Sequence, residues 1–186
     1  YVIGGDDTGI RVLDRDHEAG VKRGHLFAYV GDQRLVAFDY TPDWSAKGPG
    51  KFLEHFTGFV QSDGYKGWPA IIEEEGKPKR MVVPYERRLG CAMHIRRPFE
   101  AAATARDARA AIALTYFKSI YAVERICNVD DLVGEARYHK RRELSLPVVD
   151  DLFKWMADLQ PKLIPSTPIA DAVRYALNQE AAFRRC

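Results

Sequence analysis

The chain has 186 residues and an ordinary globular composition, with 46% hydrophobic and 29% charged residues. This length suits one domain with a substantial core or one domain with an insertion. No apolar run approaches the ~20 residues of a membrane span, and we expect no signal peptide. The three cysteines include no Cys-x-x-Cys pair, which argues against a disulfide framework and favours a reducing compartment.

Charge is distributed unevenly along the chain, although the formal net charge is only +2. Residues 1–75 carry 8 basic and 13 acidic side chains, whereas residues 76–186 carry 20 and 13. An acidic first part followed by a basic second part fits an acidic metal site beside a nucleic-acid surface. On charge alone, chance variation among solvated faces explains the distribution at least as well.

The first 65 residues predict a mixed sheet whose acidic residues lie at strand ends. β-rich runs separated by polar, glycine-containing loops predict strands at residues 1–7, 25–31, 34–40 and 59–62. Residues 14–24 predict a loop, and 50–56 a short helix before the last of these strands. Residues 69–75 predict another short helix, and 87–97 one more strand with basic ends.

After Pro98 the sequence becomes helical in character. Residues 100–128 are Ala-rich with apolar side chains at helical spacing, which predicts one long helix. Residues 130–159 predict a further helical stretch, which Pro147 either kinks or restarts. A threonine cap at Thr167 followed directly by proline predicts the start of a last helix.

Two acids that follow β-rich runs, Asp6 and Asp63, form the candidate site. If their strands are parallel neighbours, both carboxylates emerge at one edge of the sheet, where ligands bind in open α/β sheets. Two nearby carboxylates stay ionised most easily around a cation, and oxygen ligands without His or Cys favour Mg²⁺ or Mn²⁺. A lone Asp at a strand end is more often a turn or cap residue, so spacing alone leaves both interpretations open.

Four short stretches, in this order, resemble motifs of one known family. Asp6-Asp7-Thr8 resembles an Asp-Glu-Thr motif, and residues 61–67 resemble a Gln-x-Asp-Gly/Ala-Tyr-x-Gly motif. Residues 91–99 resemble a Cys-x-x-His-x-Arg-Arg-x-Phe motif, and 166–178 resemble a family helix ending in Arg-Tyr-Ala-Leu-Asn. Together, over nearly the whole chain, they resemble the insertion-sequence-sixty-six type of bacterial transposases.

The resemblance implies a DDE transposase with an α/β, RNase H-like fold. Residues 1–98 would form a partial catalytic core, and residues 99–186 a helical region inserted between the second and third catalytic acids. It further implies that Asp6 and Asp63 are catalytic and bind Mg²⁺ or Mn²⁺, with two ions in the complete protein. Such a protein cuts DNA at transposon ends and joins them to target DNA, and is expected to be a homo-oligomer in the bacterial cytoplasm without membrane association.

Two departures from the family pattern affect this expectation. Asp7 replaces the family's Glu, a mild change because the preceding Asp is the expected ligand. The family's third acid is a Glu in a downstream Asn-Asn-x-x-Glu stretch that residues 1–186 lack, and Glu180 lies inside the last predicted helix and does not replace it. We therefore expect a transposase fragment that is inactive alone. The alternatives are a non-catalytic DNA- or protein-binding remnant and a stand-alone RNase H-like nuclease, which would need further acids.

Other polar motifs carry weaker predictions. Arg96 and Arg97, expected at a strand end, are candidate contacts to DNA phosphate, with a solvated strand end equally plausible. Cys91 and His94 have Cys-x-x-His spacing but no second ligand pair follows, so a structural cysteine and a packed histidine are favoured over zinc. By alternation along its strand, Asp7 is expected to point away from the Asp6 side.

The tryptophans and one basic run complete the set of predictions. Trp44 lies in the loop before the predicted short helix, and Trp68 follows the second acid motif. Packing is favoured over base stacking for both. Residues 140–142, Lys-Arg-Arg, are expected on a solvated helix face, with DNA contact as the alternative.

Overall fold

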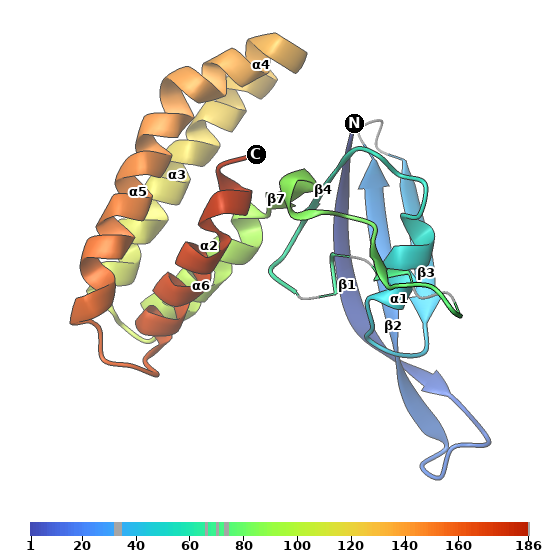
Figure 1. Cartoon of the computed structure of the whole chain (residues 1–186). Coiled ribbons are helices and arrows are strands. Elements are labelled where there is room, and N and C mark those ends of the chain that lie inside the picture. The colour runs from blue at the N-terminus through green and yellow to red at the C-terminus, as the bar shows by residue number, and fades with distance from the viewer. Residues whose placement is uncertain (32–34, 66, 70, 73–74, 186) are drawn as a thin grey trace. The chain divides into compact units, whose positions relative to one another are not determined.

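The structure is a computed structural model that describes residues 1–31, 35–65, 67–69, 71–72 and 75–185. It contains two compact units: a sheet-containing unit of residues 1–91 with Arg185, and a helical unit of residues 92–184 (Figure 1). The change of sequence character at Pro98 lies inside the first helix of the helical unit. None of the described helices is long and apolar enough to cross a membrane.

Within the described residues, a five-stranded mixed sheet has the order β3-β2-β1-β4-β7. Its strands are β1 (Val2–Leu13), β2 (Val21–Gly31), β3 (Val36–Thr41), β4 (Phe59–Ser62) and β7 (Arg88–Gly90). β2 is antiparallel to both β1 and β3, whereas β4 is parallel to β1 and β7 is parallel to β4. The predicted mixed α/β sheet is thus confirmed.

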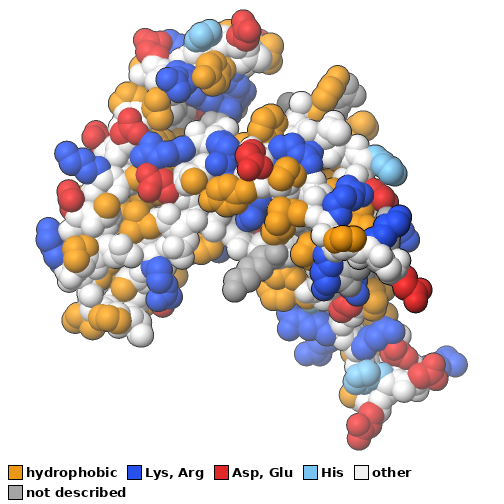
Figure 2. All heavy atoms as spheres, in the orientation of Figure 1, with side chains coloured by type: hydrophobic (Ala, Val, Ile, Leu, Met, Phe, Trp, Pro, Cys, Tyr) orange, Lys and Arg blue, Asp and Glu red, His pale blue; other side chains and the backbone are white. Residues whose placement is uncertain are grey.

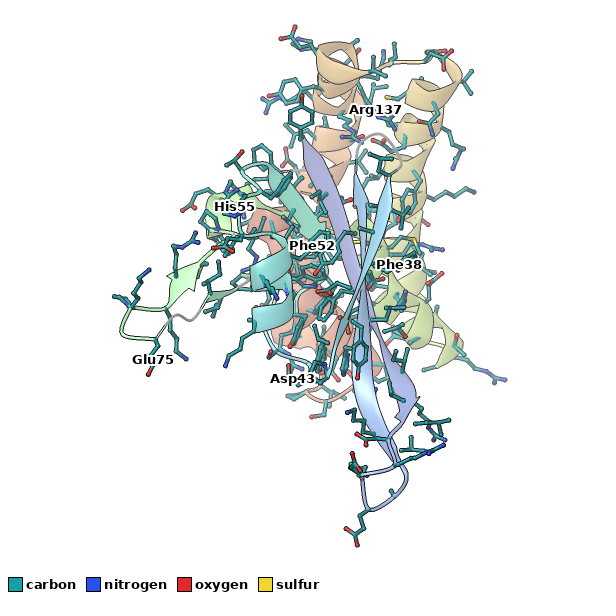
Figure 3. The ribbon with its side chains drawn as sticks, turned by 90° about the vertical axis from the view of Figure 1, so that its right-hand side faces the viewer. Phe38, Asp43, Phe52, His55, Glu75 and Arg137 are labelled. Carbon is teal, nitrogen blue, oxygen red and sulfur yellow. The ribbon has the colours of Figure 1, made fainter. Side chains whose placement is uncertain are left out.

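One face of this sheet is covered by α1 (Lys47–Phe52) and by an aromatic core. Trp68 is fully buried and packs edge-on against Phe27, with ring centroids 5.9 Å apart. The backbone approaches Trp68 so closely at Gly5 that a β-carbon there would lie 2.3 Å from the indole ring. Phe52 of α1 stacks on Tyr29 of β2 at 3.8 Å (Figure 3). The packing role predicted for Trp68 is therefore confirmed.

The segment between β4 and β7 differs from its predicted helix. Its described residues form a short antiparallel hairpin of β5 (Ile71–Ile72) and β6 (Arg80–Met81), followed by a 3₁₀ turn at Tyr85–Arg87. The helix predicted over 69–75 is wrong for the described part of that range, because two β-branched residues pair across a turn there instead.

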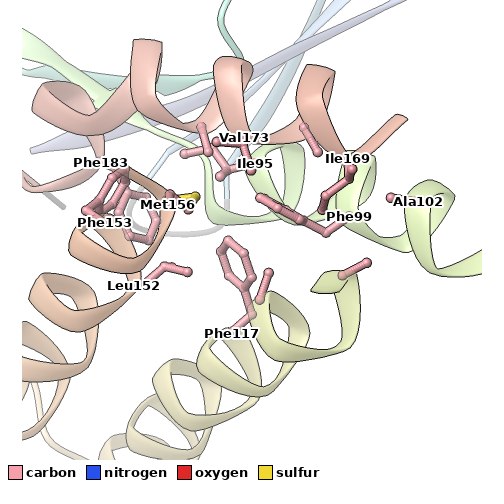
Figure 4. Close-up of a cluster of buried hydrophobic side chains, with 14 of the residues drawn as sticks. Ile95, Phe99, Ala102, Phe117, Leu152, Phe153, Met156, Ile169, Val173 and Phe183 are labelled. Carbon is pink, nitrogen blue, oxygen red and sulfur yellow. The ribbon is translucent and has the colours of Figure 1, made fainter. Parts of the chain in front are cut away.

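The helical unit contains α2 (Ala92–Thr104), α3 (Ala108–Val129), α4 (Gly134–Lys140), α5 (Leu146–Leu159) and α6 (Pro168–Phe183). A π-helical turn, Arg141–Ser145, joins α4 to α5, and a 3₁₀ turn, Gln160–Lys162, follows α5. Buried side chains from α2, α3, α5 and α6 meet in one apolar cluster (Figure 4). Pro147 lies in the first turn of α5, which is one of the alternatives predicted for it. As predicted, the hydroxyl of Thr167 caps α6.

The single helix predicted over 100–128 is wrong, because the chain breaks between α2 and α3. Arg106 adopts a left-handed conformation, with φ of 63°, that ends the first helix. Asp107 then caps α3 by accepting a hydrogen bond from the backbone N–H of Arg109 at 3.0 Å. The Ala-rich composition on both sides hides this break, although an Asp within such a run is itself a start signal.

The strand predicted over 87–97 is correct only for Arg88–Gly90, and helix α2 begins at Ala92. The buried residues of α2 are Ile95, Phe99 and Ala102, which follow a helical spacing of four and three residues. This helical spacing continues through Pro98. In the sequence, Pro98 suggested the boundary between a strand and the helical region.

A charged cluster anchors α4 and the π-helical turn to α3. One carboxylate oxygen of Glu124 accepts from Arg137 at 2.5 Å, and Arg141 donates to both oxygens at 2.6 and 2.8 Å. Figure 3 labels Arg137 at this end of the helical unit. Within the basic run at 140–142, Arg141 is thus an internal partner, and Lys140 lies 3.4 Å from Glu143.

Glu124→Gln is expected to change the acid stability of the helical unit. Burial raises the pKa of Glu124, but the hydrogen bonds from Arg141 and Arg137 outweigh it and hold the pKa below its usual 4.5. The ionised pair stabilises the fold above pH 4.5, and this contribution is lost as the pH falls through the lower folded-state pKa. Urea unfolding against pH should show the variant less stable at neutral pH, with the difference shrinking in acid. Equal profiles for Glu124→Gln and the exposed control Glu143→Gln would contradict this expectation.

Candidate functional site

Strand β1 presents Asp6 and Asp7 on opposite faces of the sheet. Asp6 pairs across the ladder with Ala28, which pairs with Phe38, so these three side chains share one face. Asp6 and Phe38 are exposed (Figure 3 labels Phe38). Asp7 lies on the other face, with only 10% of its side chain exposed. The predicted separation of the two acids is thus confirmed.

The register between β1 and β4 aligns Asp6 with Asp63. The two strands are parallel neighbours, with Ile3 opposite Val60 and Gly4 opposite Gln61. The same offset, continued for two residues, sets Asp6 opposite Asp63, which directly follows β4. A shared site for Asp6 and Asp63 was expected only if their strands are parallel neighbours. β1 and β4 meet this condition.

The donor set suits a hard divalent cation. Mg²⁺ is commonly bound through one or two carboxylates, with waters and substrate phosphates completing its shell. Asp6 and Asp63 supply carboxylate oxygens, and the exposure of Asp6 leaves room for water and phosphate. No group of three or more His, Cys, Asp or Glu side chains in the described ranges is positioned to hold a metal. Metal binding by the two-carboxylate pair stays a prediction.

Asp63 is held by a tight turn at the end of β4. Its Oδ1 accepts a hydrogen bond from the backbone N–H of Tyr65 at 3.0 Å, the Asx-turn pattern. Just before it, the carbonyl of Ser62 accepts from the backbone N–H of Cys91 at 3.1 Å, which ties the strand end to β7. The turn engages one carboxylate oxygen of Asp63, so it is compatible with metal binding through the other oxygen.

A line of stacked rings connects the Asp63 turn to Asp7. Tyr65 stacks on Trp44 with centroids 4.1 Å apart, and Trp44 stacks on His25 at 5.4 Å. His25 Nδ1 lies 3.0 Å from Asp7 Oδ2, and the Tyr65 hydroxyl donates to the Trp44 carbonyl at 2.5 Å. We call Tyr65, Trp44 and His25 the aromatic stack. Trp44 is 53% exposed, so it packs on one side while staying accessible.

The electrostatics of this region are negative. Burial raises the pKa of Tyr65, and the carboxylates of Asp7, Asp43 and Asp63 raise it further. The phenol therefore keeps its proton and its hydrogen bond to the Trp44 carbonyl at neutral pH. The same negative field would favour a cation near Asp63.

Trp44→Ala is expected to loosen the turn that holds Asp63. Removing the indole deletes both ring contacts, each worth about 0.5–1.5 kcal/mol. Amide hydrogen exchange at the Tyr65 N–H should become roughly tenfold faster, because this N–H is the donor to Asp63. Tyr138→Phe, in the helical unit, is the control and should leave this rate unchanged. An unaltered Tyr65 rate in Trp44→Ala would show that the stack does not support the turn.

The predicted DNA-contacting arginines lie on a helix, so their placement at a strand end was wrong. Arg96 and Arg97 belong to α2 of the helical unit, whereas Asp6 and Asp63 belong to the sheet unit. Arg96 forms an ion pair with Glu100, four residues later, at 2.7 Å, while Arg97 is exposed. Adjacent residues of a helix point in different directions, so Arg96 and Arg97 lie in different surroundings. Contact of either arginine with DNA stays a prediction.

Sequence reasoning missed the aromatic stack and the His25–Asp7 pair. His25 lies opposite Gly9 in the β1–β2 register, two residues from the partner of Asp7. Alternation along β2 puts His25 and Phe27 on one face, but only the hairpin register sets Phe27 opposite Asp7 and so brings His25 to Asp7. Cys91, a half-buried free cysteine, directly follows β7 in the chain, and the choice between a structural role and zinc binding stays a prediction.

Comparison with known proteins assigns the chain to a family. The family model for "Transposase IS66 family" matches residues 1–186, the whole chain. The uncharacterized protein y4hP of Sinorhizobium fredii (strain NBRC 101917 / NGR234) is 26% identical over 200 residues, covering 96% of this chain and 34% of the relative. Protein y4qI of the same strain, also uncharacterized, is 27% identical over 173 residues, covering 86% of this chain and 31% of the relative.

The chain spans about a third of the length of these curated relatives. No solved structure matches it. The match of the family model over every residue confirms the family predicted from the four motifs, and the chain belongs to the IS66 transposase family.

Proposed function

We propose that this chain is the metal-dependent catalytic portion of a DNA transposase with an RNase H-like core. The observation that carries the proposal is the register of β1 and β4, which aligns Asp6 with Asp63 at adjoining central strands. The sheet order and directions support an RNase H-like arrangement, since three antiparallel strands adjoin two parallel ones at β1. Membership of a transposase family supports a role in transposition, and the reaction proposed here is DNA cleavage at transposon ends and strand transfer into target DNA.

In this proposal Asp6 and Asp63 hold Mg²⁺ or Mn²⁺ through carboxylate oxygens. Ions bound there would activate a water or a DNA 3′-hydroxyl and would stabilise the leaving oxygen. The N–H of Tyr65 fixes one oxygen of Asp63, which orients the carboxylate before substrate arrives. Asp6, on the exposed face, is accessible to a phosphodiester. No side chain has to act as a covalent nucleophile.

A strand-transfer and nicking assay on DNA carrying transposon ends tests this proposal. With Mg²⁺ or Mn²⁺, residues 1–186 alone are expected to be inactive, because the family's Asn-Asn-x-x-Glu stretch is absent from them. A polypeptide that also carries such a stretch should be active. Robust activity of residues 1–186 that Asp63→Ala abolishes would place a third ligand within this chain. Activity unaffected by both Asp6→Asn and Asp63→Asn would contradict the site.

A second candidate function is DNA or protein binding without catalysis. It is favoured by the lack of a three-ligand metal group in the described residues and by the basic second part of the chain. DNA affinity measured against salt concentration separates the two candidates. A steep salt dependence that Asp6→Asn leaves unchanged, together with no metal-dependent cleavage in the longer polypeptide, would favour the binding function.

A further inference from the structure

Strands β1 and β2 continue beyond the sheet as a two-stranded ribbon. β4 pairs with β1 only at Val2–Gly4, and β3 pairs with β2 only from His25 to Val30. Residues 10–13 and 21–24 therefore pair only with each other, and Figure 1 shows them extending away from the sheet. We call these eight residues the ribbon. The loop predicted over 14–24 is correct for residues 14–20 and wrong for 21–24, where β2 continues the ladder.

Two arginines lie directly opposite each other on the ribbon. Arg11 of β1 faces Arg23 of β2 in the register, so both side chains project from the same face. Both are exposed, and neither forms an ion pair or hydrogen bond with a residue of the described chain. Like charges in directly opposite positions destabilise a strand pair. The stability of the ribbon therefore does not explain why two arginines lie opposite each other.

The other charges of the ribbon do not neutralise this pair. Lys22, on the opposite face, forms an ion pair with Asp14 at 2.7 Å. Asp16 and Glu18 belong to the turn at the tip, where Figure 2 shows acidic and basic side chains together. The uncompensated positive charge thus lies on one face, between the tip and the sheet.

The surface around the two arginines forms a hollow that is partly lined by backbone atoms. A β-carbon at Gly9 would lie 2.7 Å from Nε and Nη2 of Arg23, so the guanidinium lies across a position without a side chain. An open hollow of about 480 Å³ is lined by Gly9, Ile10, Arg11, Val21, Lys22 and Arg23. Two guanidinium groups beside an open hollow match the shape and charge of a phosphodiester.

We propose that Arg11 and Arg23 form a binding site for the phosphodiester backbone of duplex DNA. The choice of DNA rests on the proposed function. A two-stranded antiparallel ribbon is narrow enough to enter the major groove, where its side chains reach the flanking phosphates. Arg11 lies five residues from Asp6 on the same strand, about 17 Å at the usual rise per residue. By alternation along β1, Arg11 and Arg23 share the face of Asp7 and not that of Asp6, so the ribbon site is distinct from the Asp6–Asp63 site.

The test is the binding of the 186-residue chain to a fluorescently labelled DNA duplex of mixed sequence, at several salt concentrations. In the double variant Arg11→Gln/Arg23→Gln the Kd should rise about tenfold, and the slope of log K against log salt should become shallower by roughly 1–2. Arg174→Gln is the matched control, because this exposed arginine on α6 is already paired with Asp171 at 2.7 Å. It should bind as the wild type does.

A charge reversal separates the site from a folding effect. Arg23→Glu sets opposite charges across the ladder from Arg11, which should keep or raise the thermal stability of the chain while weakening DNA binding. If the double variant and Arg23→Glu both bound DNA as tightly as the wild type, with the same salt slope, the ribbon site would be overturned. The proposed function would not be affected by that result. An equal loss in Arg174→Gln would also overturn the ribbon site. If the wild-type chain bound no DNA, the ribbon site and the proposed DNA partner would fail together.

Discussion

Asp63→Asn is expected to lower DNA strand transfer on the order of 10³-fold or more in a polypeptide that joins residues 1–186 to the third family acid. Asparagine keeps the shape of the side chain and can still accept from the Tyr65 N–H, so the turn at the end of β4 should survive. What it removes is one of two carboxylate charges aligned by the β1–β4 register. The loss should therefore fall on metal-dependent chemistry and leave folding intact.

The matched control for Asp63→Asn is Asp158→Asn, an exposed change of the same charge on α5. It should transfer DNA strands at the wild-type rate. Circular dichroism and thermal unfolding establish that both variants fold. If Asp63→Asn retained more than a tenth of the activity, or if Asp158→Asn lost as much, Asp63 would not be a metal ligand.

Phe117→Ala is expected to destabilise the helical unit by about 3–5 kcal/mol. Phe117 is fully buried on α3, with its ring centroid 6.1 Å from Phe99 of α2 and 6.5 Å from Phe183 of α6 (Figure 4). Alanine would leave a cavity that three helices line, and a packed core relaxes only partly around such a loss.

Urea unfolding followed by circular dichroism at 222 nm measures this effect, since the helices dominate that signal. Val129→Ala, at the end of the same helix and 82% exposed, should change stability by less than about 0.5 kcal/mol. A loss below about 1 kcal/mol in Phe117→Ala would mean that the four helices do not share one core.

Local patterns predicted the elements well where side-chain periodicity and termination signals agreed. The strands of β2 and β4, and the start of α6 at Thr167, follow directly from alternation and capping. The break at Arg106 was missed because Ala-rich residues favour helix on both sides of it. The start of α2 was missed because Pro98 was taken as a boundary, although the buried side chains keep a helical spacing across it.

The candidate site shows a different limit. Asp6 and Asp63 were found as acids that follow β-rich runs and then through motifs, and their alignment needed two strands that are parallel neighbours. The aromatic stack links three segments that are distant in sequence, so no local pattern predicts it. The opposed arginines on the ribbon depend on the hairpin register, which a loop of uncertain length left open at the sequence level.

The most direct test of the Asp6–Asp63 site is paramagnetic broadening by Mn²⁺ in the NMR spectrum of the ¹⁵N-labelled chain. Low Mn²⁺ concentrations should broaden the amides around Asp6 and Asp63 first, because even weak binding relaxes nearby nuclei strongly. The broadening at both positions should disappear in Asp63→Asn and persist in Asp158→Asn. First broadening at the acidic tip of the ribbon, or a pattern unchanged by Asp63→Asn, would contradict a metal site shared by the two aspartates.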